Sequence, residues 1–199
     1  KETMPFAFSE VKDTGAVFGF ALAESVEEIV FLRASGFLSE AFLEDRLKRL
    51  FATGRKVVAF DVKKSKLMCE NLKVEQSFDL AIAAYLIDPL RGEYPYDEVL
   101  LEYDGTTSVV RSELPKDMSL TEVELLWNDK LVHFCCAEAF AAIRLYPILD
   151  NKIRVMGMER LFYEIEMPLL FTLYRMEQRG IKADKEALTS KNESLEADI

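Results

Sequence analysis

The stretch PFAFSEVKD (Pro5 to Asp13) fixes the beginning of a sheet. Its first four residues form a short apolar run with two phenylalanines, which predicts a buried β-strand. Successive side chains of a strand point to opposite faces, so Ser9 and Val11 share one face and Glu10 points to the other. Glu10 is therefore expected to face away from whatever Ser9 and Val11 contact.

Two more strands and a helix follow this stretch. AVFGFAL at 16–22 and EIVFL at 28–32 are short, rich in aromatic and β-branched residues, and bounded by turn signals, which predicts a three-stranded meander. Ser39 is expected to cap a helix that ends at Gly54, because leucines recur on one side of the intervening segment. A fourth strand is predicted at 56–60.

The remainder of the chain is mainly helical. Helices are expected over 62–72, 78–88, 96–102, 120–147, 159–180 and 184–199. Pro168 should bend the fifth of these, and the last is so polar that it should pack poorly. A meander followed by alternating helices and a strand predicts an α/β protein with a mixed sheet flanked by helices, an order that suits a ribonuclease-H-like fold.

The composition limits the kinds of partner. The chain has 199 residues, half of them hydrophobic, and a formal net charge of −10. A free-standing DNA-binding domain usually presents a basic face, so strong binding to DNA by this chain alone is not expected. Basic clusters such as KKSK at 63–66 are interpreted as solvated surface. No uninterrupted apolar run of about 18 residues is present, and neither a signal peptide nor a membrane partner is expected.

Cysteine and histidine usage argues against disulfide and zinc chemistry. The three cysteines, Cys69, Cys135 and Cys136, form no C-x-x-C pattern, which fits a reducing compartment. His133 is the only histidine and is expected to be structural or exposed to solvent.

The C-terminal stretch ERLFYEIEMPLLFTLYRMEQRGIKADKEAL, residues 159–188, resembles bacterial DNA polymerase I. In that family this segment leaves the 3′–5′ exonuclease domain and begins the polymerase domain. SFDLAIAAYLIDP at 77–89 and the opening FAF strand are similar to the exonuclease domain of the same family. The resemblance implies an exonuclease-like domain over 1–156 and a truncated helical start of the polymerase domain over 157–199.

Exonucleases of this family use four carboxylates and a tyrosine, because two Mg²⁺ ions that assist phosphodiester hydrolysis need oxygen ligands. The resemblance places the first two carboxylate positions on Ser9 and Val11, and the third on Ser65, four residues after Asp61. The tyrosine position falls on Phe134, and the fourth carboxylate position on Glu138. This implies a degenerate site without a catalytic set, and an empty, uncharged hollow at Ser9, Val11, Ser65 and Glu138.

Three functional interpretations remain open. The first is a catalytically silent domain that acts as a scaffold for the polymerase in DNA replication and repair. The second is an active metal-dependent exonuclease with relocated carboxylates, with Glu10, Asp61, Asp79 and Glu138 as candidate ligands; Asp79 and Asp61 can also be helix caps. The third is a module that binds DNA or a protein in the cleft where the exonuclease site of the family would lie. Tyr94, Tyr96 and Phe134 would be its stacking surfaces.

The resemblance also implies the surroundings of the domain. The expected partners are the polymerase domain of the same chain and, in the intact enzyme, DNA. The chain is expected to be a piece of a longer, monomeric protein of the bacterial cytoplasm. No cofactor is expected here, since Mg²⁺ would serve the polymerase domain.

Overall fold

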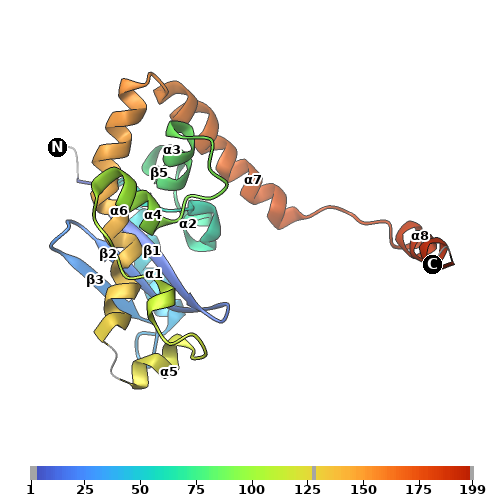
Figure 1. Ribbon diagram of the computed structural model, residues 1–199, viewed down its shortest axis with the longest axis horizontal. Helices are drawn as coiled ribbons and strands as arrows, with labels where there is room; N and C mark the ends of the chain where they lie inside the picture. The colour runs from blue at the N-terminus through green and yellow to red at the C-terminus, as the bar shows by residue number, and fades with distance from the viewer. Residues whose placement is uncertain (1–3, 127–128, 198–199) are drawn as a thin grey trace.

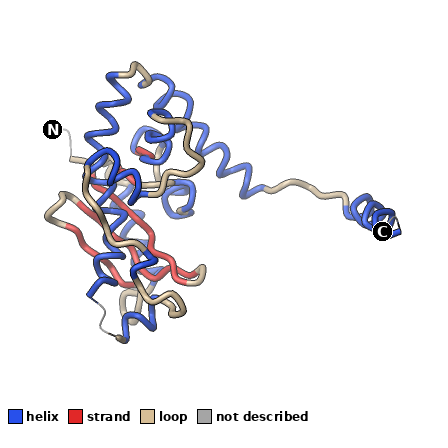
Figure 2. Tube along the Cα trace, viewed as in Figure 1, coloured by secondary structure: helices blue, strands red, loops and turns tan. Residues whose placement is uncertain are grey.

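One mixed five-stranded sheet organises the computed structural model, which describes residues 4–126 and 129–197 (Figures 1 and 2). The strand order is β3-β2-β1-β4-β5. The strands are β1 (Phe6–Asp13), β2 (Ala16–Ala23), β3 (Ile29–Arg33), β4 (Val57–Ala59) and β5 (Ser77–Asp79). The first three are antiparallel neighbours, whereas β4 and β5 run parallel to β1. The predicted meander and the mixed α/β sheet are confirmed, and the order is consistent with a ribonuclease-H-like fold.

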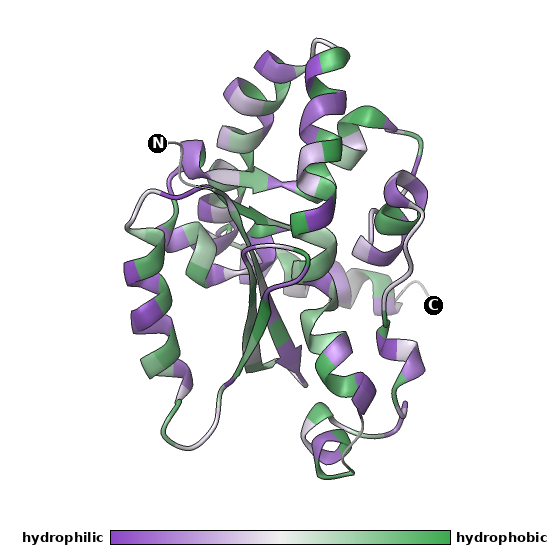
Figure 3. Ribbon diagram, turned by 90° about the vertical axis from the view of Figure 1, so that its left-hand side faces the viewer, coloured by the Kyte–Doolittle hydropathy of each residue, from purple (hydrophilic) through white to green (hydrophobic). Residues whose placement is uncertain are grey.

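The described helices other than α8 surround this sheet or extend from it (Figure 1). The short 3₁₀ and π segments are η1 (Val62–Lys64), η2 (Val74–Gln76), η3 (Arg111–Glu113) and η4 (Leu161–Glu166). The α-helices are α1 (Glu40–Phe51), α2 (Lys66–Asn71), α3 (Leu80–Ile87), α4 (Tyr96–Asp104), α5 (Leu120–Leu125), α6 (Asp129–Val155), α7 (Met167–Arg179) and α8 (Lys185–Ala197). In Figure 3, hydrophobic and hydrophilic residues alternate along most helices, as expected for helices that bury one side.

The two faces of the sheet are covered by different helices. On one face, the ring of Phe8 stacks on Phe20 at 5.9 Å and meets Phe51 of α1 edge to face at 5.4 Å. Ser39 caps α1 as predicted, because its side chain accepts a hydrogen bond from the amide of Phe42. On the other face, α6 packs across the strands and contacts Val11 through the cluster that contains Leu131.

Helix α6 differs from its prediction at both ends. The expected single helix over 120–147 is α5 and α6, and Trp127, which falls between them, lies outside the described residues. Pro147 was expected to end the helix, but α6 continues to Val155. Leu145 and Leu149, two residues before and after the proline, are fully buried, so tertiary packing outweighs the lost backbone hydrogen bond.

By length and composition alone, α6 is apolar enough to span a bilayer. Core helices pass the same test, and α6 has the contacts of a core helix. It packs against four of the strands, and Ala139, Ala142 and Ile153 have no exposed surface.

The segments η4 and α7 pack into the same core as the sheet. Phe162 of η4 and Met167 and Phe171 of α7 belong to the main apolar cluster with the sheet. The π-helical turn η4 lies directly before Pro168, which occupies the first turn of α7. The helix therefore accommodates the proline through a π segment. The boundary between residues 156 and 157 stays a prediction.

Helix α8 stands away from the body of the molecule (Figure 1). Every side chain of α8 that the structure describes is exposed, including Leu188 and Leu195. The prediction that the tail packs poorly is confirmed for these residues.

Gly19 of β2 pairs with Arg33 of β3 and leaves no room for a side chain. A Cβ atom at this position would sit 2.5 Å from the backbone oxygen of Leu32 and 2.6 Å from the ring of Phe31. Because a backbone atom cannot move aside cheaply, Gly19→Ala should lower the free energy of unfolding by about 1–2 kcal/mol in urea titrations. Gly92→Ala is the control, since a Cβ there meets nothing within 4 Å. Equal urea midpoints for Gly19→Ala and Gly92→Ala would contradict the close approach of the Leu32 backbone to Gly19.

Candidate functional site

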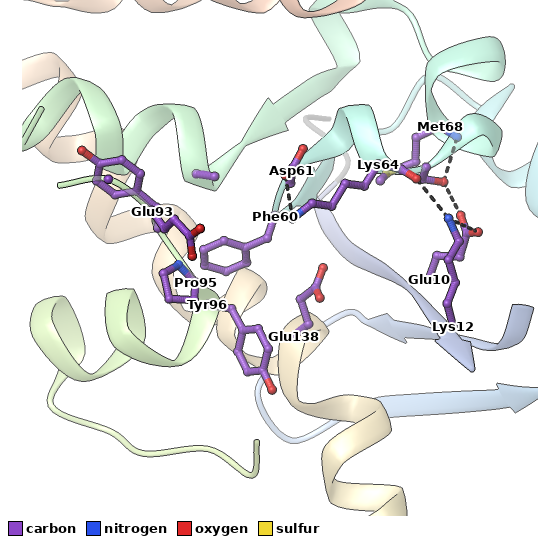
Figure 4. A pocket seen from close by; sticks show the side chains of 14 residues that line it. Glu10, Lys12, Phe60, Asp61, Lys64, Met68, Glu93, Pro95, Tyr96 and Glu138 are labelled. Atoms are coloured by element: carbon purple, nitrogen blue, oxygen red, sulfur yellow. Dashed lines mark hydrogen bonds and ion pairs between the residues drawn. The ribbon is translucent and has the colours of Figure 1, made fainter. Parts of the chain in front are cut away.

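A pocket of about 830 Å³ opens at the end of β1 (Figure 4). Its walls come from β1, the segment after β4, the loop before α4, and α6. The charged side chains that line it are those of Glu10, Lys12, Asp61, Lys64, Glu93 and Glu138. The aromatic side chains are those of Phe60, Tyr94 and Tyr96.

The pocket forms because β4 is much shorter than β1. The two strands pair only at Phe6–Val57 and Ala7–Val58. After Ala59 the chain leaves the sheet through Asp61, whose left-handed φ of 49° turns it into η1. The second half of β1 therefore has no strand beside it on the β4 side of the sheet. Side chains of η1 and α2 lie beside it instead.

Glu10 points into this pocket. Its Oε2 accepts a hydrogen bond of 2.6 Å from Ser65 Oγ, and its Oε1 lies 3.2 Å from Lys12 Nζ. The prediction that Glu10 faces away from the site is wrong. Alternation does place Glu10 on the opposite face of the strand from Ser9 and Val11. However, the pocket opens where β1 runs on past the end of β4, and the face of β1 that carries Glu10 reaches it there.

Ser9 and Val11, the first two positions implied by the resemblance, do not line the pocket. Ser9 is 2 % exposed, and within the described residues its Oγ has no hydrogen-bond partner. Val11 packs with Leu131 and Cys135 in a second apolar cluster, and Phe134 packs against the same cluster. The predicted uncharged hollow at Ser9, Val11, Ser65 and Glu138 is wrong. The pocket includes Ser65 and Glu138 but neither Ser9 nor Val11, and charged side chains line it.

Of the five positions implied by the resemblance, Ser65 and Glu138 line the pocket. Ser65 is buried; it donates to Glu10 and also caps α2 by accepting from the amide of Met68 at 3.3 Å. Glu138 enters from α6, and burial raises the pKa of its carboxyl group to about 7. Lys64 opposes that rise in the pKa, whereas the negative charge of Asp61 adds to it.

Asp61 pairs with Lys64, with 2.8 Å between Oδ2 and Nζ. The side chain of Asp61 makes no hydrogen bond that caps the following turn, so its predicted role as a helix cap is wrong. The lysine is largely exposed, which places this pair at the rim of the pocket.

Asp79 lies beside the pocket and not in its wall. Its Oδ1 accepts from the amides of Ala81 and Ile82, and its Oδ2 accepts from the amide of Val62 at 2.7 Å. The predicted cap of α3 is confirmed. Burial raises the pKa of Asp79 to about 6. With both oxygens engaged by backbone amides, Asp79 ties η1 to α3 and is a poor metal ligand.

The aromatic side chains form a wall of the pocket. The ring of Phe60 meets Tyr96 edge to face at 6.3 Å, and the Tyr96 hydroxyl donates to the carbonyl of Val109. Tyr94 donates to the carbonyl of Asp88. Tyr94 and Tyr96 therefore lie in the pocket as predicted, whereas Phe134 does not.

The residues do not fit a two-metal site. The resemblance implies Mg²⁺ for an active exonuclease, but three of the four carboxylate positions hold serine or valine. Both oxygens of Glu10 are already engaged by Lys12 and Ser65. Among residues 4–126 and 129–197, no three His, Cys, Asp or Glu side chains come close enough together to hold a metal ion.

Lys12, Lys64 and Phe60 were missed by sequence reasoning. The KKSK cluster at 63–66 was visible in the sequence but was interpreted as solvated surface. His133 was expected to be either structural or exposed to solvent, and it is exposed.

Curated relatives of the chain are bacterial DNA polymerases I. The enzyme of Rhizobium leguminosarum is 26% identical over 135 residues, which is 66% of this chain and 13% of the relative. That of Treponema pallidum is 31% identical over 112 residues, 56% of this chain and 11% of the relative. That of Caldicellulosiruptor bescii is 25% identical over 184 residues, 90% of this chain and 18% of the relative. The chain thus spans less than a fifth of each of these proteins.

A solved structure supports the fold. The POL domain of Pol1 from M. smegmatis, in complex with DNA primer-template and dNTP, superimposes with a TM-score of 0.64 and 20% identity. The match covers 90% of this chain and 29% of that chain. No family model matches the chain. The similarity to bacterial DNA polymerase I that the motifs indicated is therefore found independently.

Proposed function

We propose that this chain is a catalytically silent 3′–5′ exonuclease-like domain of a bacterial DNA polymerase I. The domain has a ribonuclease-H-like fold and covers residues 1–156, and residues 157–199 begin the polymerase part. It acts as a scaffold for the polymerase in the cytoplasm, within a monomeric enzyme that contacts DNA through its other parts. The domain itself needs no cofactor.

The placement of Ser9 and Val11 carries this proposal. Both lie on the α6 face of β1, where carboxylates would be needed to hold metal ions near Glu138. A serine hydroxyl and a valine cannot neutralise the charge that develops during phosphodiester hydrolysis. Val11 and Phe134 now pack in one apolar cluster, so the missing groups have been replaced by core packing.

The surface of the last helices supports a scaffold. Exposed apolar side chains recur every three or four residues along η4 and α7, at Leu161, Ile165, Leu169, Leu173 and Met176. This spacing puts them along one side of the helix. Such a stripe fits contact with a neighbouring part of the same protein.

One observation favours the second candidate, an active exonuclease with relocated carboxylates. Glu10, Asp61 and Glu138 line one pocket although they are far apart in the sequence. Against it, Glu10 is paired with Lys12 and Asp61 with Lys64. We therefore keep the silent domain as the function that the geometry supports best.

A nuclease assay separates the two. The chain is incubated with 3′-labelled single-stranded DNA and Mg²⁺ or Mn²⁺, beside the variants Glu138→Ala, Glu10→Ala and, as a control outside the pocket, Glu44→Ala. We expect no metal-dependent shortening of the DNA by any of them. Trimming that Glu138→Ala or Glu10→Ala abolishes and Glu44→Ala leaves intact would overturn the proposal. Binding without trimming that weakens as salt is added would instead indicate a DNA-binding module.

A further inference from the structure

We infer that the ammonium group of Lys12 takes the place of a bound divalent ion in the pocket. It holds β1 against the turn that follows β4. The inference rests on the proposed silent function, because it explains how the carboxylate of Glu10 is kept in place without metal. It concerns Lys12, Glu10 and the segment 64–65.

The ammonium group of Lys12 bridges two segments that are more than 50 residues apart in the sequence. Its Nζ lies 3.2 Å from Glu10 Oε1 on its own strand and donates to the carbonyl oxygen of Lys64 at 3.1 Å. A cation in contact with a carboxylate and a backbone carbonyl has the kind of ligands that a hard metal ion takes. Here a side chain supplies the positive charge.

Glu10 is well enclosed by these contacts. Its side chain is only 11% exposed, and its second oxygen accepts the 2.6 Å hydrogen bond from Ser65. Both oxygens of Glu10 thus have partners, so neither oxygen is free to bind a metal ion. A charged group at this depth needs its counter-ion, because an unpaired buried charge is costly.

The bridge also takes the place of sheet pairing. The backbone ladder between β1 and β4 ends at Ala7 and Val58. Beyond that point, the bonds from Lys12 to Lys64 and from Ser65 to Glu10 hold β1 against η1 and the start of α2. Loss of the positive charge should therefore loosen the pocket and leave Glu10 able to attract another cation.

Thermal unfolding at low ionic strength tests this inference. Lys12→Met should lower Tm by about 2–4 °C, and millimolar MnCl₂ should restore part of that loss, whereas KCl at equal ionic strength should not. Lys12→Arg keeps the charge and should keep the Tm of the native chain. Lys48→Met removes an exposed lysine paired with Glu44 and should show neither the loss nor the restoration.

The outcomes separate this inference from the proposed function. Stabilisation of the native chain by MnCl₂, or a Tm loss in Lys12→Met that MnCl₂ and KCl restore equally, would overturn the role of Lys12. An unchanged Tm in Lys12→Met would overturn it as well. DNA trimming by the native chain would instead overturn the silent function, and that assay is independent of the Tm measurements.

Discussion

Phe162→Ala should lower the free energy of unfolding of the whole described body by about 3–5 kcal/mol, the usual cost of truncating a buried phenylalanine. Phe162 has no exposed surface. Its ring centroid lies 4.7 Å from that of Phe78 in β5 and 4.9 Å from that of Tyr163. Phe78 in turn meets Tyr146 of α6 at 4.9 Å. The truncation would open a cavity where η4, the sheet and α6 meet.

Urea unfolding followed by circular dichroism measures this loss. Leu161→Ala is the matched control, because the neighbouring leucine is 36% exposed and its truncation should cost much less. The experiment also examines the predicted boundary between residues 156 and 157. A single transition that shifts as a whole would show that η4 and α7 unfold together with the sheet. A sheet transition that stays in place in Phe162→Ala would contradict the expected loss.

The fold was predictable where local pattern and tertiary structure agree. The meander was found because its strands are separated by turn signals and carry apolar, β-branched residues. β5 was missed, since its three residues Ser77–Asp79 are too few to show any periodicity and merge with the following helix. Pro147 misled the prediction of α6 for another reason: the core contacts of a long helix are not visible in its sequence.

The site was predictable in part. The resemblance found Ser65 and Glu138, and both line the pocket. Alternation along β1 gave the correct face for Glu10 but the wrong conclusion, because where a pocket opens depends on how far β4 extends beside β1. How far β4 extends is set by the whole sheet and cannot be read from the local sequence of β1. The contact of Lys12 was equally hidden, because its partner Lys64 is 52 residues away in the sequence.

The protonation of Glu138 should make the stability of the protein fall as pH rises. Burial raises the pKa of Glu138 from 4.5 to about 7. Between these values the folded chain keeps a proton that the unfolded chain releases, so the free energy of unfolding decreases with pH until the folded pKa is passed. At about 1.4 kcal/mol per pH unit, this loss amounts to at most about 3 kcal/mol, and less because Glu138 borders an open pocket. Asp79, whose pKa is raised to about 6, adds a loss of the same sign at lower pH.

Glu138→Gln removes this contribution because the amide has no charge to bury. We expect urea midpoints of the variant and the native chain to be close at pH 5, and the variant to be more stable at pH 8 by up to about 3 kcal/mol. Glu93→Gln makes the same change at an exposed position of the same pocket and should leave the native pH dependence in place. If the native chain and Glu138→Gln show parallel pH profiles, the carboxyl group of Glu138 is not buried as the structure has it.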